Sequence, residues 1–282
     1  MFEPVLTVGI ATLNRPQYLE EAIKSVVSAA HKSKCRIQLV VSDMGGNIKS
    51  FEAFTRSTHQ SPSWLECEWY CDTKIQSGIQ NWDNCLEKAR GRYYMMIGDD
   101  DRLLPDAFIQ LMTVLGDFSC DVTGLLASAR DIDANGQHRR TMLNKSRLYE
   151  GRKFLADVVT RKLALRWCAF IAKTSVLKSC SPFKYPFPGG GGSADGAAIV
   201  SAALAGNIVT LDVAISEFRV HDGNDSRSIS LAYQRDQREA LLQFVDSLPQ
   251  ITAADQSLIS VWLGAGIRFQ CLRWAIQGKL DT

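Results

Sequence analysis

Short apolar runs alternate with stretches of helical periodicity over the first hundred residues of the chain. The run Val5–Ala11 is apolar and rich in β-branched residues, which predicts a buried strand. From Pro16, apolar residues recur at spacings of three and four, as they do on one face of a helix. A second run, Ile37–Val41, predicts another strand. This order predicts an α/β fold with a mostly parallel sheet, in which ligands bind at the carboxyl ends of the strands.

A third unit repeats the same order and ends in acidic residues. We predict a strand at Glu68–Cys71, a helix near Asn81–Ala89 and a further strand at Tyr93–Ile97. Three aspartates, Asp99–Asp101, stand one glycine beyond that strand. They are therefore expected at the edge of the sheet where ligands bind.

Beyond Pro105 the alternation becomes less regular. Residues 151–178 mix helix and strand signals, and the stretch 181–193, with three prolines and four consecutive glycines, predicts a mobile loop. The other predictions are a helix at 106–115, a strand at 122–129, a turn at 133–137, a helix at 195–204, a strand at 208–211, a segment at 214–220 that leads into a turn, and C-terminal helices at 233–246 and 254–277.

Charge and composition bear on partners and location. Lys and Arg total 32 against 30 Asp and Glu, so the net charge of +2 gives no electrostatic reason to expect a nucleic-acid partner. The chain opens without a basic and then apolar segment, and no run approaches the ~20 apolar residues of a membrane span. We therefore expect a cytoplasmic protein that binds no nucleic acid.

The eight cysteines show no CxxC pair and no histidine at ligand spacing, which argues against zinc. Cys67 and Cys71 could form a disulfide or half of a metal site. In a chain without an export signal, buried free thiols are favoured. The other six are Cys35, Cys85, Cys120, Cys168, Cys180 and Cys271.

Three successive carboxylates create an electrostatic problem at the end of the strand. Two like charges ~4 Å apart repel by roughly 4 kcal/mol at an effective dielectric constant of 20. A divalent cation that prefers oxygen ligands, Mg²⁺ or Mn²⁺, would offset this repulsion and could bridge the phosphates of a nucleotide. The alternative is a solvated acidic turn in which Asp101 caps the next helix.

Four segments share a pattern with a known family, and they stand in that family's order. They are Thr12–Ile23, Val40–Asp43, Asn81–Tyr94 and Gly98–Ala107. The chain thereby resembles the inverting, GT-A fold glycosyltransferases of family 2. A weaker resemblance continues through Ser193–Asp195 and Glu217–His221.

The resemblance implies a Rossmann-like GT-A fold with a mixed, mostly parallel sheet flanked by helices, followed by C-terminal helices. It also implies that the first loop meets the nucleoside, that Asp43 binds the base and that two helical asparagines border base and ribose. Without the resemblance, Asn14 would be a helix N-cap, Asp43 a strand-end turn and the asparagines a solvated helix face. The implied nucleotide-sugar-binding residues are Thr12, Asn14, Arg15, Asp43, Asn81, Asn84, Asp99 and Asp100.

The acidic run departs from the family's pattern because Gly98 stands where its first aspartate falls. Counting back from Pro105 then makes Asp100 the metal ligand and directs Asp99 to the donor ribose or sugar. Asp101 is expected to be a second ligand or a helix cap. The implied metal is Mn²⁺ or Mg²⁺, held by Asp100, Asp101 and His221.

Two residues of the second half complete the expected site. Asp195 takes the place of the family's general base, although Ala194 replaces the glutamate that precedes it; its alternative role is an N-cap for the following helix. His221 falls where some relatives have a histidine that reaches the metal or the diphosphate, and Arg219 precedes it as in the family. A structural histidine is the alternative.

The implied function is transfer of a hexose or deoxyhexose from a nucleoside diphosphate sugar to a hydroxyl of a glycan or lipid-linked acceptor of the cell envelope. A nucleotidyltransferase is disfavoured because residues 11–16 contain no glycine. A sugar-nucleotide-binding module without catalysis is the other alternative. The expected organisation is a catalytic domain at 1–230, with a donor half (1–115) and an acceptor half (116–230), and a helical extension at 231–282.

Two further segments invite interpretation. The glycine run 189–192 suits a lid over the donor and acceptor, or an inert surface loop. The last helix mixes apolar and aromatic residues with Arg268, Arg273 and Lys279, so it could rest peripherally on an anionic membrane at the inner face of the plasma membrane. Packing on the catalytic domain or on a second subunit is the simpler account.

Overall fold

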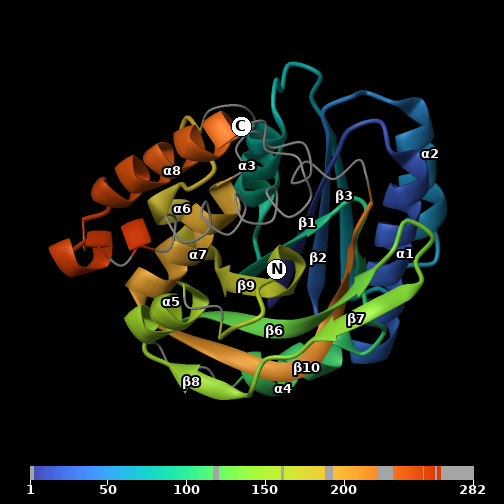
Figure 1. Ribbon diagram of the computed structural model, residues 1–282. Helices are drawn as coiled ribbons and strands as arrows, with labels where there is room; N and C mark the ends of the chain where they lie inside the picture. The colour runs from blue at the N-terminus through green and yellow to red at the C-terminus, as the bar shows by residue number, and fades with distance from the viewer. Residues whose placement is uncertain are drawn as a thin grey trace.

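The computed structural model describes residues 3–116, 121–159, 162–187, 193–221, 231–249, 251–257 and 259–261. A mixed sheet lies between two layers of helices (Figure 1). Its strands are β1 (Leu6–Thr12), β2 (Ile37–Asp43), β3 (Leu65–Cys71), β4 (Tyr93–Gly98), β5 (Arg102–Leu103), β6 (Val122–Ile132), β7 (His138–Met142), β8 (Arg147–Tyr149), β9 (Phe170–Lys173) and β10 (Asn207–Arg219). The helices are α1 (Pro16–Ser33), α2 (Ile48–Thr58), α3 (Gly78–Lys88), α4 (Ala107–Leu115), α5 (Gly151–Val159), the 3₁₀ turn η1 (Trp167–Ala169), α6 (Thr174–Cys180), α7 (Ala194–Ala205) and α8 (Leu231–Asp246).

The strand order is β3-β2-β1-β4-β9-β6-β10-β5, with β7 beside β6 and β8 beside β10. β3, β2, β1 and β4 are parallel, so their carboxyl ends lie side by side. β9 is antiparallel to both β4 and β6, and β10 runs parallel to β6. The α/β fold and the mixed, mostly parallel sheet expected from the sequence are confirmed.

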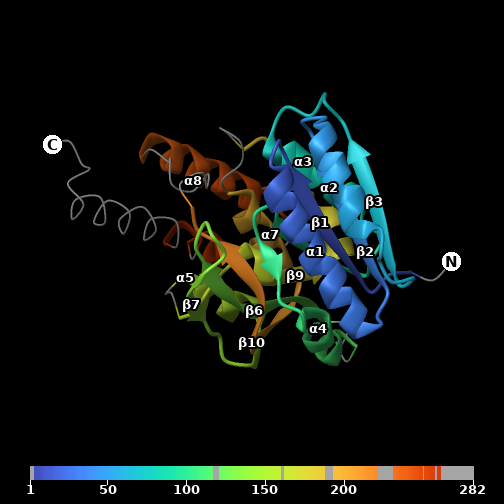
Figure 2. The same cartoon turned by 90° about the vertical axis from the view of Figure 1, so that its right-hand side faces the viewer.

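Each face of the sheet has its own hydrophobic core because side chains alternate along the strands. On β1, Leu6, Val8 and Ile10 point toward α1 and α4 and are fully buried. The opposite face packs against α3, α5, α6 and α7, and α8 packs on α7 in the same core. α1 and α2 lie at one end of the molecule and α8 at the other (Figure 2). The sheet therefore holds its strand ends between two packed layers.

Several elements were not predicted from the sequence, and the packing explains why. The most buried residues of α2 are Ser50, Ala53 and Ser57, which are small and mostly polar, so its buried face does not stand out as apolar in the sequence. β5, β7 and β8 have at most five residues each. The segments at 208–211 and 214–220 are one strand, β10, which is interrupted by irregularities in its pairing with β6 between Thr210 and Ser216.

Other expectations fall partly outside the described residues. Residues 181–187 contain no helix or strand, whereas the glycine run 189–192 lies outside the description. Helical residues occur at 253–257 and 259–261, and the remainder of the helix expected at 254–277, with its three basic residues, is outside it as well. Among the described helices, none is both long and apolar enough to cross a bilayer.

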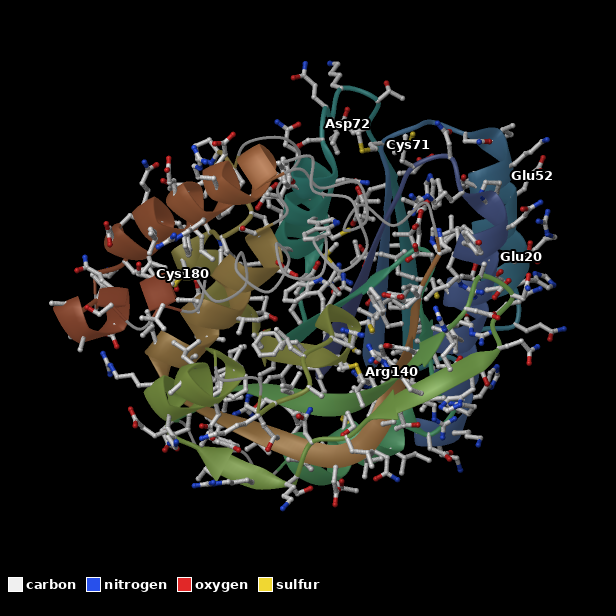
Figure 3. The ribbon with its side chains drawn as sticks, in the orientation of Figure 1. Glu20, Glu52, Cys71, Asp72, Arg140 and Cys180 are labelled. Carbon is white, nitrogen blue, oxygen red and sulfur yellow. The ribbon has the colours of Figure 1, made fainter. Side chains whose placement is uncertain are left out.

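The six described cysteines are free thiols. Cys71 is exposed at the end of β3, which corrects the expectation that it is buried, and Cys67 is half-buried. Figure 3 shows Cys71 and Cys180 on different parts of the molecule. Cys120 and Cys271 lie outside the described residues.

Candidate active site

Three neighbouring strand ends bring the predicted residues to one edge of the sheet. Ala11 of β1 pairs with Gly98 of β4, and Thr12 pairs with Asp43 of β2. The ends of these strands and the loops that follow them carry six of the eight expected donor-binding residues, and α3 carries Asn81 and Asn84. The common position of the strand ends follows from the parallel pairing alone.

Asp99 lies just beyond β4 and is 6% exposed. One carboxylate oxygen, Oδ2, accepts a hydrogen bond of 2.8 Å from the Thr12 hydroxyl, and Oδ1 lies 3.4 Å from Arg15 Nη1. Burial raises the pKa of Asp99 to about 6, and the bond from Thr12 and the charge of Arg15 oppose that rise. Thr12, Arg15 and Asp99 thus form one connected group.

Asp100 is the aspartate of the run that meets two basic side chains. Its Oδ2 lies 2.8 Å from His221 Nε2 and 3.4 Å from Arg15 Nη1. Its side chain is 11% exposed, as is that of His221. The structure therefore brings together the two residues expected to share a metal, although they are 121 positions apart in the chain.

Asp101 is held by the backbone. Its Oδ1 accepts the Arg219 N–H at 2.9 Å and its Oδ2 accepts the Gly98 N–H at 3.2 Å. Burial, together with the charge of Asp100, raises the pKa of Asp101 to about 7. Because both carboxylate oxygens already have partners, the geometry favours Asp101 as an anchor of the loop, neither exposed to solvent nor turned toward a ligand.

Gly98 has a steric role in this loop. A Cβ at this position would stand 2.6 Å from Asp100 Oδ1 and 3.1 Å from Asp101 Oδ2. The two carboxylates fold back over the glycine and use the space that a side chain would fill. The departure from the family's acidic pattern therefore has a local physical cause.

The loop after β2 is organised by Asp43, which is fully buried. Its two carboxylate oxygens accept the N–H groups of Gly45 at 2.8 Å and Asn47 at 3.1 Å. Asn14 has a left-handed backbone, with φ of 55°, and its side-chain oxygen accepts a bond of 3.3 Å from Asn47 Nδ2. Asn14 is not the N-cap of α1, which is Arg15. The first two loops are thus joined to each other.

The two asparagines of α3 bond to the strand ends. Asn81 is 1% exposed and donates from Nδ2 to the carbonyls of Thr12 and Ser42 at 3.2 and 3.0 Å. Asn84 donates to the Ser42 hydroxyl at 2.8 Å. The alternative of a solvated helix face is therefore wrong for Asn81. Its amide instead fixes β1 against β2 beneath the loops.

Asp195 belongs to a different element from the acidic run. It occupies the first turn of α7, one residue after the helix begins at Ala194, and its Oδ1 accepts the Gly196 N–H at 2.7 Å. Burial raises the pKa of Asp195. Within the described part of the chain, no hydrogen bond or ion pair joins Asp195 to Asp99–Asp101.

Three residues of the site's surroundings were not assigned a role from the sequence. Arg219 is 1% exposed and contacts the acidic loop, and its guanidinium lies 4.9 Å from the centre of the Tyr18 ring and 2.6 Å from Glu21 Oε2. Tyr18 and Glu21 are three positions apart on α1, so they share one helix face. This spacing is the signal in the sequence that could have related Tyr18 to Glu21. Their contact with Arg219 on β10 could not be inferred from the sequence.

The side chains near the acidic loop provide only some of the ligands that a divalent cation needs. No group of three His, Cys, Asp or Glu side chains converges as a metal site in the ranges that the structure describes. The carboxylate of Asp100 and the imidazole of His221 nevertheless form an oxygen and nitrogen pair that suits Mn²⁺, and Mg²⁺ could use the carboxylate. The remaining ligands would then be phosphate oxygens and water, as is common for Mg²⁺ in nucleotide sites.

Comparison with known proteins relates the chain to sugar transfer. The sequence model of the family described as glycosyl transferase family 2 matches residues 7–173, which is more than half of the chain. A protein of Nostoc sp. that is named an uncharacterized glycosyltransferase is 25% identical over 237 residues, covering 80% of this chain and 68% of that protein.

Two solved structures share the fold. Residues 1–349 of S. aureus TarS, in complex with UDP-GlcNAc, align with a TM-score of 0.69 at 14% identity, covering 94% of this chain and 73% of that one. The mannosyltransferase PcManGT from Pyrobaculum calidifontis, in complex with GDP-Man and Mn²⁺, aligns with a TM-score of 0.62 at 14% identity. The alignment covers 100% of this chain and 77% of that one.

Proposed function

The chain belongs to glycosyl transferase family 2, and on this premise we propose that it moves a sugar from a nucleoside diphosphate donor to a hydroxyl with inversion, using the acidic loop after β4 to hold the diphosphate. One observation carries the proposal. Asp100 lies at the carboxyl edge of the sheet between the basic side chains of Arg15 and His221. TarS with UDP-GlcNAc and PcManGT with GDP-Man support a sugar nucleotide as the donor class.

In this proposal, different loops bind different parts of the sugar nucleotide. The first two loops, joined through Asn14 and shaped by Asp43, receive the nucleoside. Thr12 and Asp99 face the ribose or the sugar, and Arg15 provides positive charge for the diphosphate. Asn84, which is partly exposed on α3, borders the ribose, whereas Asn81 acts through the backbone that it holds.

Asp100 and His221 would hold a Mn²⁺ or Mg²⁺ ion. Such an ion, when bound, stabilises the charge that develops on the departing diphosphate. The PcManGT complex with Mn²⁺ supports the choice of metal. Asp101 keeps Asp100 in place by bonding to two backbone N–H groups.

Asp195 is the proposed general base, which takes the proton of the attacking hydroxyl. Burial raises the pKa of its carboxyl, and a base whose pKa is closer to the working pH transfers protons more effectively. The position at the first turn of α7 lies in the acceptor half of the proposed catalytic domain. A hexose or deoxyhexose as the transferred group, a glycan or lipid-linked acceptor of the cell envelope and a cytoplasmic location stay predictions from the sequence.

Donor binding can be tested by thermal unfolding with UDP or GDP, with and without Mn²⁺. A ligand that binds only the native state adds about 2.7 kcal/mol at a hundred times its dissociation constant. We expect Asp100→Asn to lose the part of this stabilisation that depends on Mn²⁺. Asp106→Asn is the control, because Asp106 is exposed and pairs with Lys32 on the surface. Equal metal dependence in both variants would contradict the role of Asp100.

Catalysis can be tested by measuring the release of nucleoside diphosphate from a panel of sugar nucleotides in the presence of acceptor. We expect Asp195→Asn to bind donor as the wild type does and to lose at least about 100-fold in turnover, since general base catalysis contributes that much. Near-normal turnover in this variant would remove Asp195 as the base. Donor binding by the wild type without release from any donor and acceptor pair would favour the non-catalytic binding module.

A further inference from the structure

We propose that Tyr18 and Arg219 are positioning residues that form a clamp on the acidic loop, fixing the carboxylate of Asp100 and the imidazole of His221 as a ready pair of ligands. We define the clamp as Tyr18 and Arg219, whose guanidinium is held by Glu21. The proposal rests on the function proposed above. Tyr18 and Glu21 come from α1 and Arg219 from the end of β10, so the clamp joins the two halves of the molecule.

Arg219 holds the acidic loop at two successive residues. Its backbone N–H donates to Asp101 Oδ1 at 2.9 Å, and its side-chain Nε donates to the main-chain carbonyl of Asp100 at 2.7 Å. One bond therefore fixes a side chain of the loop and the other fixes its backbone. Rotation of the Asp100 peptide, which would redirect the carboxylate, would break the second bond.

The guanidinium of Arg219 is itself held from several directions. Nη2 lies 2.6 Å from Glu21 Oε2, and Nη1 donates to the carbonyl of Ala134 at 3.0 Å in the turn between β6 and β7. The ring of Tyr18 covers the guanidinium at 4.9 Å, within the range of a cation–π contact. A planar group that is bound at each end and covered on one face has a single orientation available.

Tyr18 connects this arginine to the proposed metal ligand. Its ring also stacks on the imidazole of His221, with centroids 5.4 Å apart and planes 29° from parallel. The imidazole Nε2 lies 2.8 Å from Asp100 Oδ2. Arg219 thus bonds to the backbone of Asp100, and His221 bonds to its carboxylate. The Tyr18 ring contacts the side chains of both Arg219 and His221.

A purely structural role would produce the same contacts, so the test must separate stability from ligand geometry. Mutation of residues that contact and orient metal ligands typically lowers metal affinity by 10–100-fold. Loss of a structural contact lowers the unfolding midpoint and leaves the affinity of the folded protein unchanged. Direct measurement of Mn²⁺ binding distinguishes the two.

The experiment titrates Mn²⁺ in the presence of UDP or GDP and follows free Mn²⁺ by electron paramagnetic resonance. We expect Tyr18→Leu to raise the dissociation constant for Mn²⁺ at least tenfold, and Tyr18→Phe, which keeps the ring, to bind as the wild type does. Tyr185→Leu is the matched control. Tyr185 is also half-buried, and its ring contacts Phe187 at a tilt and Phe244 edge-on.

Variants at the arginine itself complete the test. Arg219→Lys keeps the charge and loses the planar set of donors, and we expect it to weaken Mn²⁺ binding as Tyr18→Leu does. Because Arg219 is fully buried, this variant could fail to fold, and the two Tyr18 variants then decide the question. Wild-type Mn²⁺ affinity in folded Tyr18→Leu would overturn the clamp alone. Absence of Mn²⁺ binding by the wild type with either nucleotide would overturn the proposed metal role as well as the clamp.

Discussion

At the scale of single residues, Gly98 determines how the aspartates after β4 are arranged. A Cβ there would lie 2.6 Å from Asp100 Oδ1, so any other residue must displace that carboxylate. The obstructing atoms are the ends of side chains, which can move at little cost to the fold. A substitution at Gly98 should therefore reduce activity more than it reduces the free energy of unfolding.

We expect Gly98→Ala to reduce kcat/KM for sugar transfer by about 100-fold, because small displacements of reacting or ligating groups have effects of this size. The free energy of unfolding should fall by only about 1 kcal/mol. Gly78→Ala is the control, since a Cβ at Gly78 would meet nothing within 4 Å. Enzyme kinetics and urea unfolding measure the two effects. Wild-type activity in Gly98→Ala would contradict the steric role.

The residues of the site could be predicted to different degrees. Asp99–Asp101 are visible in the sequence because they follow an apolar strand directly. Asp100 and His221 could be paired only through the family's pattern, since nothing local relates residues 121 positions apart. Tyr18 and Glu21 lie on a helix that was predicted, but their contact with Arg219 depends on how β10 crosses the sheet.

At the scale of elements, the predictable parts are those that bury long apolar faces. β1, α1, β2 and β4 do so: the ends of the three strands agree with the sequence prediction to within two residues, and α1 begins at Pro16 as expected. α2 was missed because its buried face consists of small residues, although Asn47 caps it by accepting the Lys49 N–H at 2.9 Å. β10 was divided because irregular pairing near residue 212 breaks its alternation.

β6, β7 and the segment before η1 are joined by one buried carboxylate. Asp131 of β6 bonds to Arg166 at 2.8 Å and to Arg140 of β7 at 2.7 Å. Arg140 lies on the surface of β7 (Figure 3). Burial by itself would raise the pKa of Asp131, but the bonds from Arg166 and Arg140 outweigh it and lower the pKa. The ionised form is therefore favoured by folding.

A pH-dependent contribution to stability follows from this lowered pKa. The contribution is complete above the unfolded pKa of about 3.9 and is lost as the pH falls through the lower folded value. We expect Asp131→Asn to cost about 2 kcal/mol at pH 7 and much less near pH 2.5. Urea unfolding at both pH values measures this, with Asp212→Asn, an exposed carboxyl, as the control. An equal loss at both pH values would show that ionisation is not the cause.

At the scale of the whole molecule, the described residues of α8 are part of the core on one face of the sheet, which bears on the extension expected at 231–282. Leu241, Phe244 and Val245 of α8 are buried in the same cluster as the side chains of α7. Arg152 of α5 forms two bonds to Asp255, at 2.7 and 3.0 Å. The part of the chain before residue 231 and the described residues after it therefore share one hydrophobic core.

We expect Phe244→Ala to lower the free energy of unfolding of the whole chain by about 3–5 kcal/mol, because it leaves a cavity in the shared core. Unfolding should stay a single transition when followed by tryptophan fluorescence and by circular dichroism. Phe51→Ala, at a site that is 45% exposed, should cost at most about 1 kcal/mol. A separate early transition that leaves residues 1–115 folded would instead indicate that residues 231–282 form an independent unit.

The bond between Asp101 and the N–H of Arg219 joins positions 118 residues apart. A nascent chain emerges from the ribosome in order, and its early segments can fold before later ones are made. The acidic loop can thus emerge together with β1, β2 and β4 while the partners that hold it are still untranslated. Ribosome-bound chains that end before residue 219 should fail to retain a donor nucleotide, so the ability to bind substrate is acquired late in synthesis.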